Sequence, residues 1–138
     1  MDNDKIGPLR NGARGVLRRK IVWQADAFAI IAPWEGKVER VPSAMVFDPH
    51  QPFILVSRVF PEAMSEAACL LAAVEEALFT YGVTPTEVQV RWGKGKRNRA
   101  LEALAARTGF RLVLCDELRE LAEVKADLGE FARSVLEA

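Results

Sequence analysis

Residue types that would quickly assign a function are scarce in this sequence. The chain has two cysteines and one histidine, and it has no Cys-x-x-Cys motif. Because structural zinc sites are built from cysteine and histidine ligands, we interpret Cys69 and Cys115 as buried thiols rather than as zinc ligands or a disulfide. His50 lies in a proline-flanked turn without an obvious nucleophile or base beside it, which predicts a surface histidine.

Long hydrophobic runs are also missing. No apolar stretch approaches the ~20 residues that a membrane-spanning helix needs. The first residues, Met-Asp-Asn-Asp-Lys, do not show the basic-then-apolar layout of a signal peptide. We therefore expect a cytoplasmic protein with no membrane partner.

Net charge is the third missing feature, because the chain has 19 basic and 19 acidic residues. Bulk electrostatics therefore imply no polyanionic partner. The charges are distributed unevenly, however. Residues 1–20 hold six basic and two acidic residues, residues 91–99 hold five basic and no acidic residues, and residues 116–138 hold seven acidic and three basic residues. This pattern predicts a surface with basic and acidic regions.

The length and composition predict one soluble globular domain. A chain of 138 residues removes roughly two thirds of its unfolded surface from water, which is enough for one core. Residues 1–19 are polar and glycine-containing and show no helical or strand periodicity, so we expect a flexible basic arm there. Residues 20–138 are then a single α/β domain.

Three strands joined by short turns are predicted in the first half of this domain. They cover residues 21–31, 38–47 and 53–60, and turn-forming residues separate them. In the first strand, alternation places Val22, Gln24 and Asp26 on one face and Trp23, Ala25 and Ala27 on the other. Short connections favour an antiparallel meander, with Pro42 indicating an edge or a bulge in the second strand.

Helices and strands alternate in the second half. A helix following Pro61 and ending at Tyr81 has an apolar stripe, formed by Ala67, Leu70, Leu71, Val74, Leu78 and Tyr81. The fourth strand covers residues 87–92, a second helix covers 97–107, and the fifth strand covers 111–115. Asp116 is a candidate N-cap of a last helix, whose inward positions are Leu118, Leu121, Leu128, Phe131 and Val135 and whose interior contains Gly129. Because a helix between two neighbouring strands requires a parallel crossover, the prediction is a mixed five-stranded sheet with three helices.

This element order is that of the ribonuclease H-like fold, and the chain resembles in particular the integrase and transposase catalytic cores. The first strand of those cores carries a Trp-x-x-Asp pattern, and Trp23-Gln24-Ala25-Asp26 stands here in that place. Their fourth strand follows a Gly-x-Pro turn and ends in Asp-Asn-Gly, where this chain has Gly82-Val83-Thr84-Pro85 and then Arg91-Trp92-Gly93. Residues 85–128 also resemble a bacterial domain family of unknown function.

One departure from the integrase pattern argues against catalysis. The resemblance implies two divalent metals held between carboxylates, because hard cations require oxygen ligands. Here the second carboxylate position holds Arg91, a cation that repels a metal. Asp26 is then either a vestigial metal ligand or a partly exposed strand residue that pairs with Arg91, and we prefer the pair. Glu120 or Glu123 could approach Asp26 from the last helix, but we expect no catalytic residues, no metal and no cofactor.

The candidate binding site is the basic loop that follows the fourth strand. Parallel sheets bind ligands at the carboxyl ends of their strands, and a helix N-terminus following that end favours anions. Gly93 and Gly95 would let a phosphate approach the backbone. Charge and a stacking surface would come from the rest of the loop, namely Arg91, Trp92, Lys94, Lys96, Arg97 and Arg99. The alternative interpretation is a solvated loop with Trp92 covering the core.

The sequence therefore predicts a non-catalytic module that binds nucleic acid or another polyanion. Two alternatives stay open. One is a protein-interaction or oligomerisation module that uses the acidic last helix or an exposed sheet edge to bind a protein partner or a second copy. The other is a metal-dependent nuclease with an altered set of acids.

Overall fold

A computed structural model describes residues 20–34, 37–60, 64–95 and 98–127 of the chain. The predicted basic arm, residues 1–19, lies outside this part. The first three strands are β2 (Val22–Trp34), β3 (Lys37–Asp48) and β4 (Phe53–Val59). The following elements are α1 (Glu66–Tyr81), β5 (Glu87–Arg91), α2 (Trp92–Gly95), α3 (Arg99–Thr108) and β6 (Arg111–Cys115). Residues 119–127 are helical and are called the C-terminal helix below.

The five strands form one mixed sheet in the order β4-β3-β2-β5-β6. β2 pairs antiparallel with β3, and β3 pairs antiparallel with β4. β5 lies parallel to both β2 and β6. The predicted meander and the two parallel crossovers are confirmed, and the topology is ribonuclease H-like.

Local sequence signals set both ends of α1. The Ser65 hydroxyl accepts a hydrogen bond of 3.1 Å from the Ala68 amide, which caps the first turn. Gly82 ends the helix with φ of 62°, a left-handed conformation that glycine adopts without steric cost. Its amide donates to the Leu78 carbonyl at 3.0 Å.

The buried face of α1 differs from the predicted apolar stripe. Ala67 and Tyr81 are exposed, and Leu71 and Leu78 are only partly buried. The buried residues are Cys69, Leu70, Ala73, Val74 and Ala77. Small side chains allow a helix backbone to lie close to a sheet. The predicted stripe included Leu70 and Val74 but left out Cys69, Ala73 and Ala77, which shifted the predicted face around the helix axis.

The segment after β5 also differs from the prediction. β5 ends at Arg91, and Trp92 begins the one-turn helix α2 instead of ending the strand. α3 begins at Arg99 rather than at residue 97, because Asn98 caps it. The Asn98 side-chain oxygen accepts from the Leu101 amide at 3.1 Å.

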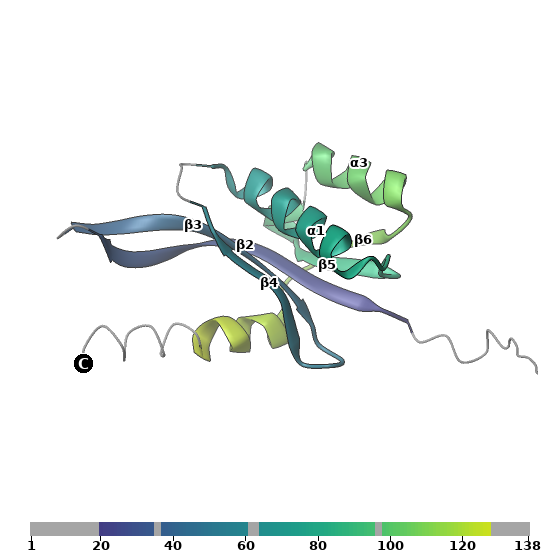
Figure 1. Ribbon diagram of the computed structural model, residues 1–138, viewed down its shortest axis with the longest axis horizontal. Coiled ribbons are helices and arrows are strands. Elements are labelled where there is room, and N and C mark those ends of the chain that lie inside the picture. The colour runs from purple at the N-terminus through teal and green to yellow at the C-terminus, as the bar shows by residue number, and fades with distance from the viewer. Residues whose placement is uncertain (1–19, 35–36, 61–63, 96–97, 128–138) are drawn as a thin grey trace, which may run out of the picture.

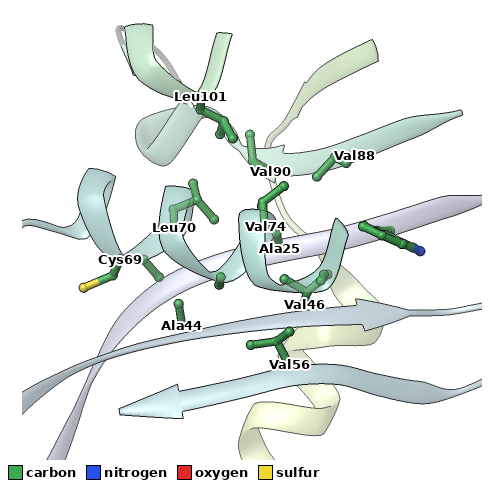
Figure 2. Close-up of a cluster of buried hydrophobic side chains, with 14 of the residues drawn as sticks. Ala25, Ala44, Val46, Val56, Cys69, Leu70, Val74, Val88, Val90 and Leu101 are labelled. Atoms are coloured by element: carbon green, nitrogen blue, oxygen red, sulfur yellow. The ribbon is translucent and has the colours of Figure 1, made fainter. Parts of the chain in front are cut away.

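Helices lie on both faces of the sheet (Figure 1). α1 and α3 cover one face, which we call the core face, and the C-terminal helix lies against the opposite face. Figure 2 shows the core face, where Leu70 and Val74 of α1 lie over Ala25, Ala44 and Val46 of the sheet. Trp23, Ala25 and Ala27 all belong to this cluster, so the predicted division of β2 into two faces is confirmed.

The opposite face holds a smaller apolar cluster. Its buried members are Met45, Phe47, Leu118 and Leu121. Leu118 and Leu121 are therefore inward, as predicted. The other predicted inward positions, Leu128, Phe131 and Val135, and the predicted break at Gly129 lie outside the described residues. Within the described residues, no helix is both long and apolar enough to span a membrane.

Candidate functional site

Polar side chains gather on the face of the sheet that the C-terminal helix covers. Strand alternation points Val88 and Val90 of β5 into the core, so that Glu87, Gln89 and Arg91 lie on the opposite face. Gln24 and Asp26 of the neighbouring β2 lie on that same face. We call this set of residues the polar face.

Asp26 is the most deeply buried charge on the polar face. Its relative exposure is 1%, so the predicted partial exposure of Asp26 is wrong, because the C-terminal helix covers this face. Arg91 Nε lies 3.1 Å from Asp26 Oδ2, which confirms the predicted pairing of these two residues. The contact is an ion pair and not a hydrogen bond, because the buried Nε–H has no acceptor in hydrogen-bond geometry within the described part of the chain.

A second cation, Lys125, contacts the same carboxylate oxygen. Its Nζ donates a hydrogen bond of 2.7 Å to Asp26 Oδ2 and lies 4.7 Å from the centre of the Phe28 ring. Sequence reasoning missed this residue. The sequence does contain a signal for it. Lys125 follows the inward Leu121 by four residues and therefore lies on the same side of the helix.

Gln24 joins the C-terminal helix to the sheet. Its side-chain oxygen accepts from the Leu121 amide at 3.1 Å. Its Nε2 donates to Glu120 Oε1 at 2.8 Å and to Gln89 Oε1 at 3.2 Å. The hydrogen bond from Gln24 lowers the pKa of Glu120. Glu120 is thus held by an amide of the sheet and does not join Asp26 as a second acid, and Glu123 is exposed.

Glu87 is a second buried acid at the other end of the polar face. Arg111 Nη2 lies 2.7 Å and Lys20 Nζ 2.9 Å from its Oε1, and Gln89 Nε2 donates to its Oε2 at 2.9 Å. The hydrogen bond from Gln89, followed by those from Arg111 and Lys20, lowers the pKa of Glu87 to about 2. Each buried acid of this face therefore has two cationic neighbours.

These residues do not fit the two-metal site that the integrase resemblance implies. Such a site requires several carboxylate oxygens converging on the ions. Within the described ranges, no group of three or more His, Cys, Asp or Glu side chains is placed to hold a metal. Asp26 instead has two side-chain cations within ion-pair distance, and these cations would repel an approaching Mg²⁺.

The residues of the predicted basic loop do not form one continuous surface in the described part of the chain. Arg91 is directed to Asp26 on the polar face, and its side chain is 39% exposed. Trp92 is 51% exposed at the start of α2. Gly93 has open space where a side chain would begin, and Lys94 and Gly95 complete α2. Lys96 and Arg97 lie outside the described residues.

At the N-terminus of α3, one of the backbone amides predicted to be open to an anion is already hydrogen-bonded within the protein. Arg99 is exposed at its first position, so one predicted cation is available there. The Leu101 amide, however, already donates to the Asn98 side chain. Asn98 is itself buried and donates from Nδ2 to the Ala67 carbonyl at 3.3 Å, which ties this helix end to α1.

The remaining candidates behave as the sequence predicts. His50 is exposed, and its backbone amide donates to Asp48 Oδ1 at 2.9 Å within the turn. Cys69 and Cys115 are free thiols, the first buried and the second partly buried. Burial raises the pKa of both thiols, which suits packing and not nucleophilic chemistry.

Comparison with solved structures supports the fold assignment. The chain is similar to the HTLV-2 integrase catalytic core domain in complex with magnesium, in its dimeric form (TM-score 0.59, 10% identity, 80% of this chain and 68% of that chain) and in its trimeric form (TM-score 0.58, 9% identity, 80% and 67%). It is also similar to a chain of the simian T-cell lymphotropic virus intasome in complex with the PP2A regulatory subunit B56 gamma (TM-score 0.51, 10% identity, 70% and 32%). At these identities the likeness concerns the fold.

No protein-family model and no curated protein matches the sequence. The resemblance of residues 85–128 to a bacterial family of unknown function therefore has no support from family models. The ribonuclease H-like fold rests on the strand order and on the structural similarity to integrase cores.

Proposed function

We propose that this protein is a non-catalytic module that binds nucleic acid or a similar polyanion. The observation that carries the non-catalytic part is the environment of Asp26. One buried carboxylate oxygen has Arg91 at 3.1 Å and Lys125 at 2.7 Å. Two side-chain cations neutralise the acid from within the protein, and Glu87 and Glu120 are held by other partners.

The binding part of the proposal rests on the fold and on the loop after β5. A similar fold occurs in the HTLV-2 integrase catalytic core domain and in a chain of the simian T-cell lymphotropic virus intasome. The loop presents the exposed Trp92 and Arg99 next to Lys94 of α2. Stacking of a base on a tryptophan is worth ~1–3 kcal/mol, and cations that follow the backbone supply the rest of the attraction.

Arg91 has a different role in this proposal from that of the other loop cations. Its guanidinium serves as the counter-ion of Asp26, so the phosphate contacts fall to Lys94, Lys96, Arg97 and Arg99. Four phosphate contacts give a slope of about −3 to −4 in a plot of log affinity against log salt concentration. The five-cation loop of the sequence prediction gives about −4 to −5, so the slope separates the two versions.

Fluorescence anisotropy with labelled single- and double-stranded DNA and RNA at several salt concentrations tests the proposal. We expect the Lys94→Ala/Arg99→Ala variant to bind more weakly and with a shallower slope. Arg107→Ala/Arg119→Ala is the matched control, because both of these arginines are exposed and lie outside the loop. Equal losses in the two double variants would overturn the assignment of the loop.

Trp92 and catalysis are tested separately. Trp92→Phe should retain most of the affinity and Trp92→Ala should lose about 1–3 kcal/mol, because stacking needs a ring. The wild-type protein should not cleave nucleic acid in the presence of Mg²⁺ or Mn²⁺. Metal-dependent cleavage that disappears in Asp26→Ala would disprove the non-catalytic proposal.

A further inference from the structure

Within the described residues, the outer edge of β4 is open to strand addition. β4 is the terminal strand of the sheet, so only one of its two long sides pairs with a strand of the described chain. The Phe60 amide donates to the Pro42 carbonyl of β3 at 2.8 Å. Because strand amides alternate in direction, the Ser57 and Val59 amides then face outward. β4 contains no proline or lysine, the residues that commonly block sheet edges.

Exposed apolar side chains lie on both faces of this edge. Phe53 is 48% exposed and packs edge-to-face on Tyr81 of α1, on the core face. Val59 is 54% exposed and stands opposite Ser43, on the polar face. The β-bulge in this ladder lies near Phe47, away from the Ser57 and Val59 amides.

One ion pair joins β4 to α1 beside this edge. Arg58 Nη1 lies 3.0 Å from Glu76 Oε1 of α1, and both side chains are about half exposed. Phe79, three residues after Glu76, is 90% exposed and therefore lies next to it on the helix surface. A surface with an adjacent cation and anion is complementary to itself under a twofold rotation.

We propose that β4 pairs antiparallel with β4 of a second copy, which forms a homodimer with one continuous sheet. The outward amides of Ser57 and Val59 supply the main-chain hydrogen bonds, as in other cases of strand addition. The paired Arg58 and Glu76 select a second copy over a strongly charged partner, since a polyanion or a basic peptide gains no net attraction at this edge. This proposal does not rest on nucleic-acid binding, because the basic loop follows β5, on the far side of β3 and β2.

Sedimentation velocity of the full chain over a wide range of concentrations tests the dimer. We expect a species of twice the 15.3 kDa monomer mass. Val59→Lys should raise the dimer dissociation constant by about tenfold or more, because an ammonium would be placed within the new sheet. Ser57→Pro should act in the same direction by removing an outward amide without breaking the β3–β4 ladder.

Two controls make the result specific to this edge. Val83→Lys introduces the same charge at an exposed valine outside β4 and should leave the dimer intact. Arg58→Glu should weaken the dimer, and Arg58→Glu/Glu76→Arg should restore it, because the charge pair is rebuilt in the reverse sense. A wild-type monomer at all concentrations would overturn the proposal. A dimer that survives both β4 variants while circular dichroism shows them folded, or one that Val83→Lys disrupts equally, would also overturn it.

Discussion

The two faces of the sheet are built from different kinds of contact. The core face packs eighteen of the described buried apolar residues, from the strands, α1, α3 and their connections, into one cluster. The cluster on the other face contains four buried apolar residues. Four of the five buried polar residues lie on this second face, namely Gln24, Asp26, Ser43 and Glu87.

This difference predicts that the two faces respond differently to substitution. On the core face, the free energy gained by burying apolar side chains is proportional to the apolar area removed from water, and it does not require a specific partner for each atom. Burial on the polar face requires that each charge and amide finds a partner, because an unpaired buried charge is costly. The polar face is therefore sensitive to single changes of charge, and it is also where an integrase-like metal site would lie.

The largest expected effect comes from removing both cations that contact Asp26. Arg91→Ala/Lys125→Ala should lower the free energy of unfolding by about 3–5 kcal/mol, because it leaves a buried carboxylate without a counter-ion. Each single variant should cost only about 1 kcal/mol, because the other cation remains. Denaturant unfolding of the wild type, the two single variants and the double variant measures the coupling energy between Arg91 and Lys125.

Asp26→Asn provides the control for this cycle. In that background the same two cation removals should cost far less, because the amide carries no charge that requires neutralisation. If the stability losses of the two single variants add up to that of the double variant while Asp26 is present, the two cations do not substitute for each other as counter-ions of Asp26.

A matched pair of leucines compares the two faces directly. Leu70 on the core face and Leu121 on the polar face are both 0% exposed. Leu70→Ala should cost about 2–5 kcal/mol of global stability. Leu121→Ala should cost less, because its cluster is small and the C-terminal helix can detach without unfolding the sheet. Hydrogen exchange should show increased opening confined to the residues near 118–127, and an equally large global loss would contradict this view.

Acid should weaken the polar face at Glu87. Its pKa is lowered from 4.5 to about 2, so the folded state binds this proton more weakly than the unfolded state does. The resulting stabilisation is complete above about pH 4.5 and is lost as the pH falls towards 2. We expect it to be about 1–3 kcal/mol, because Lys20 and Arg111 are themselves exposed to solvent. Glu87→Gln should flatten the stability profile in this range, and an unchanged slope would argue against the assignment.

The sequence predicted the strands that form both faces of the sheet, but only some of the contacts that the helices make with them. Alternation along residues 22–27 and the Gly and Pro turns predicted the strands and placed Trp23 on the face opposite to Asp26. The Asp26–Arg91 pair was also predicted, because both residues end up on neighbouring parallel strands. Lys125 and Gln24 were missed as partners, since their contacts join residues 99 and 97 positions apart.

Within α1, residue size misled the prediction. The helix buries Ala73 and Ala77, and pattern reasoning gave more weight to Leu71 and Leu78. The basic loop shows a further limit. Its composition identified a cationic segment, but not that Trp92 would begin a one-turn helix and remain about half exposed. The direction of a side chain at a strand end depends on where the strand stops, and β5 stops one residue earlier than predicted.

Asn98 gives the smallest and most specific prediction, because it is the one buried polar residue of the described chain outside the polar face. It accepts from the Leu101 amide and donates to the Ala67 carbonyl, so both ends of its amide are satisfied. Asn98→Ala should cost about 1 kcal/mol through the lost helix cap. Asn98→Asp should cost less, because aspartate caps as well and loses only the donor to Ala67. Thermal and denaturant unfolding can separate these variants, and equal losses would mean that the contact to α1, and not the cap, is what Asn98 contributes.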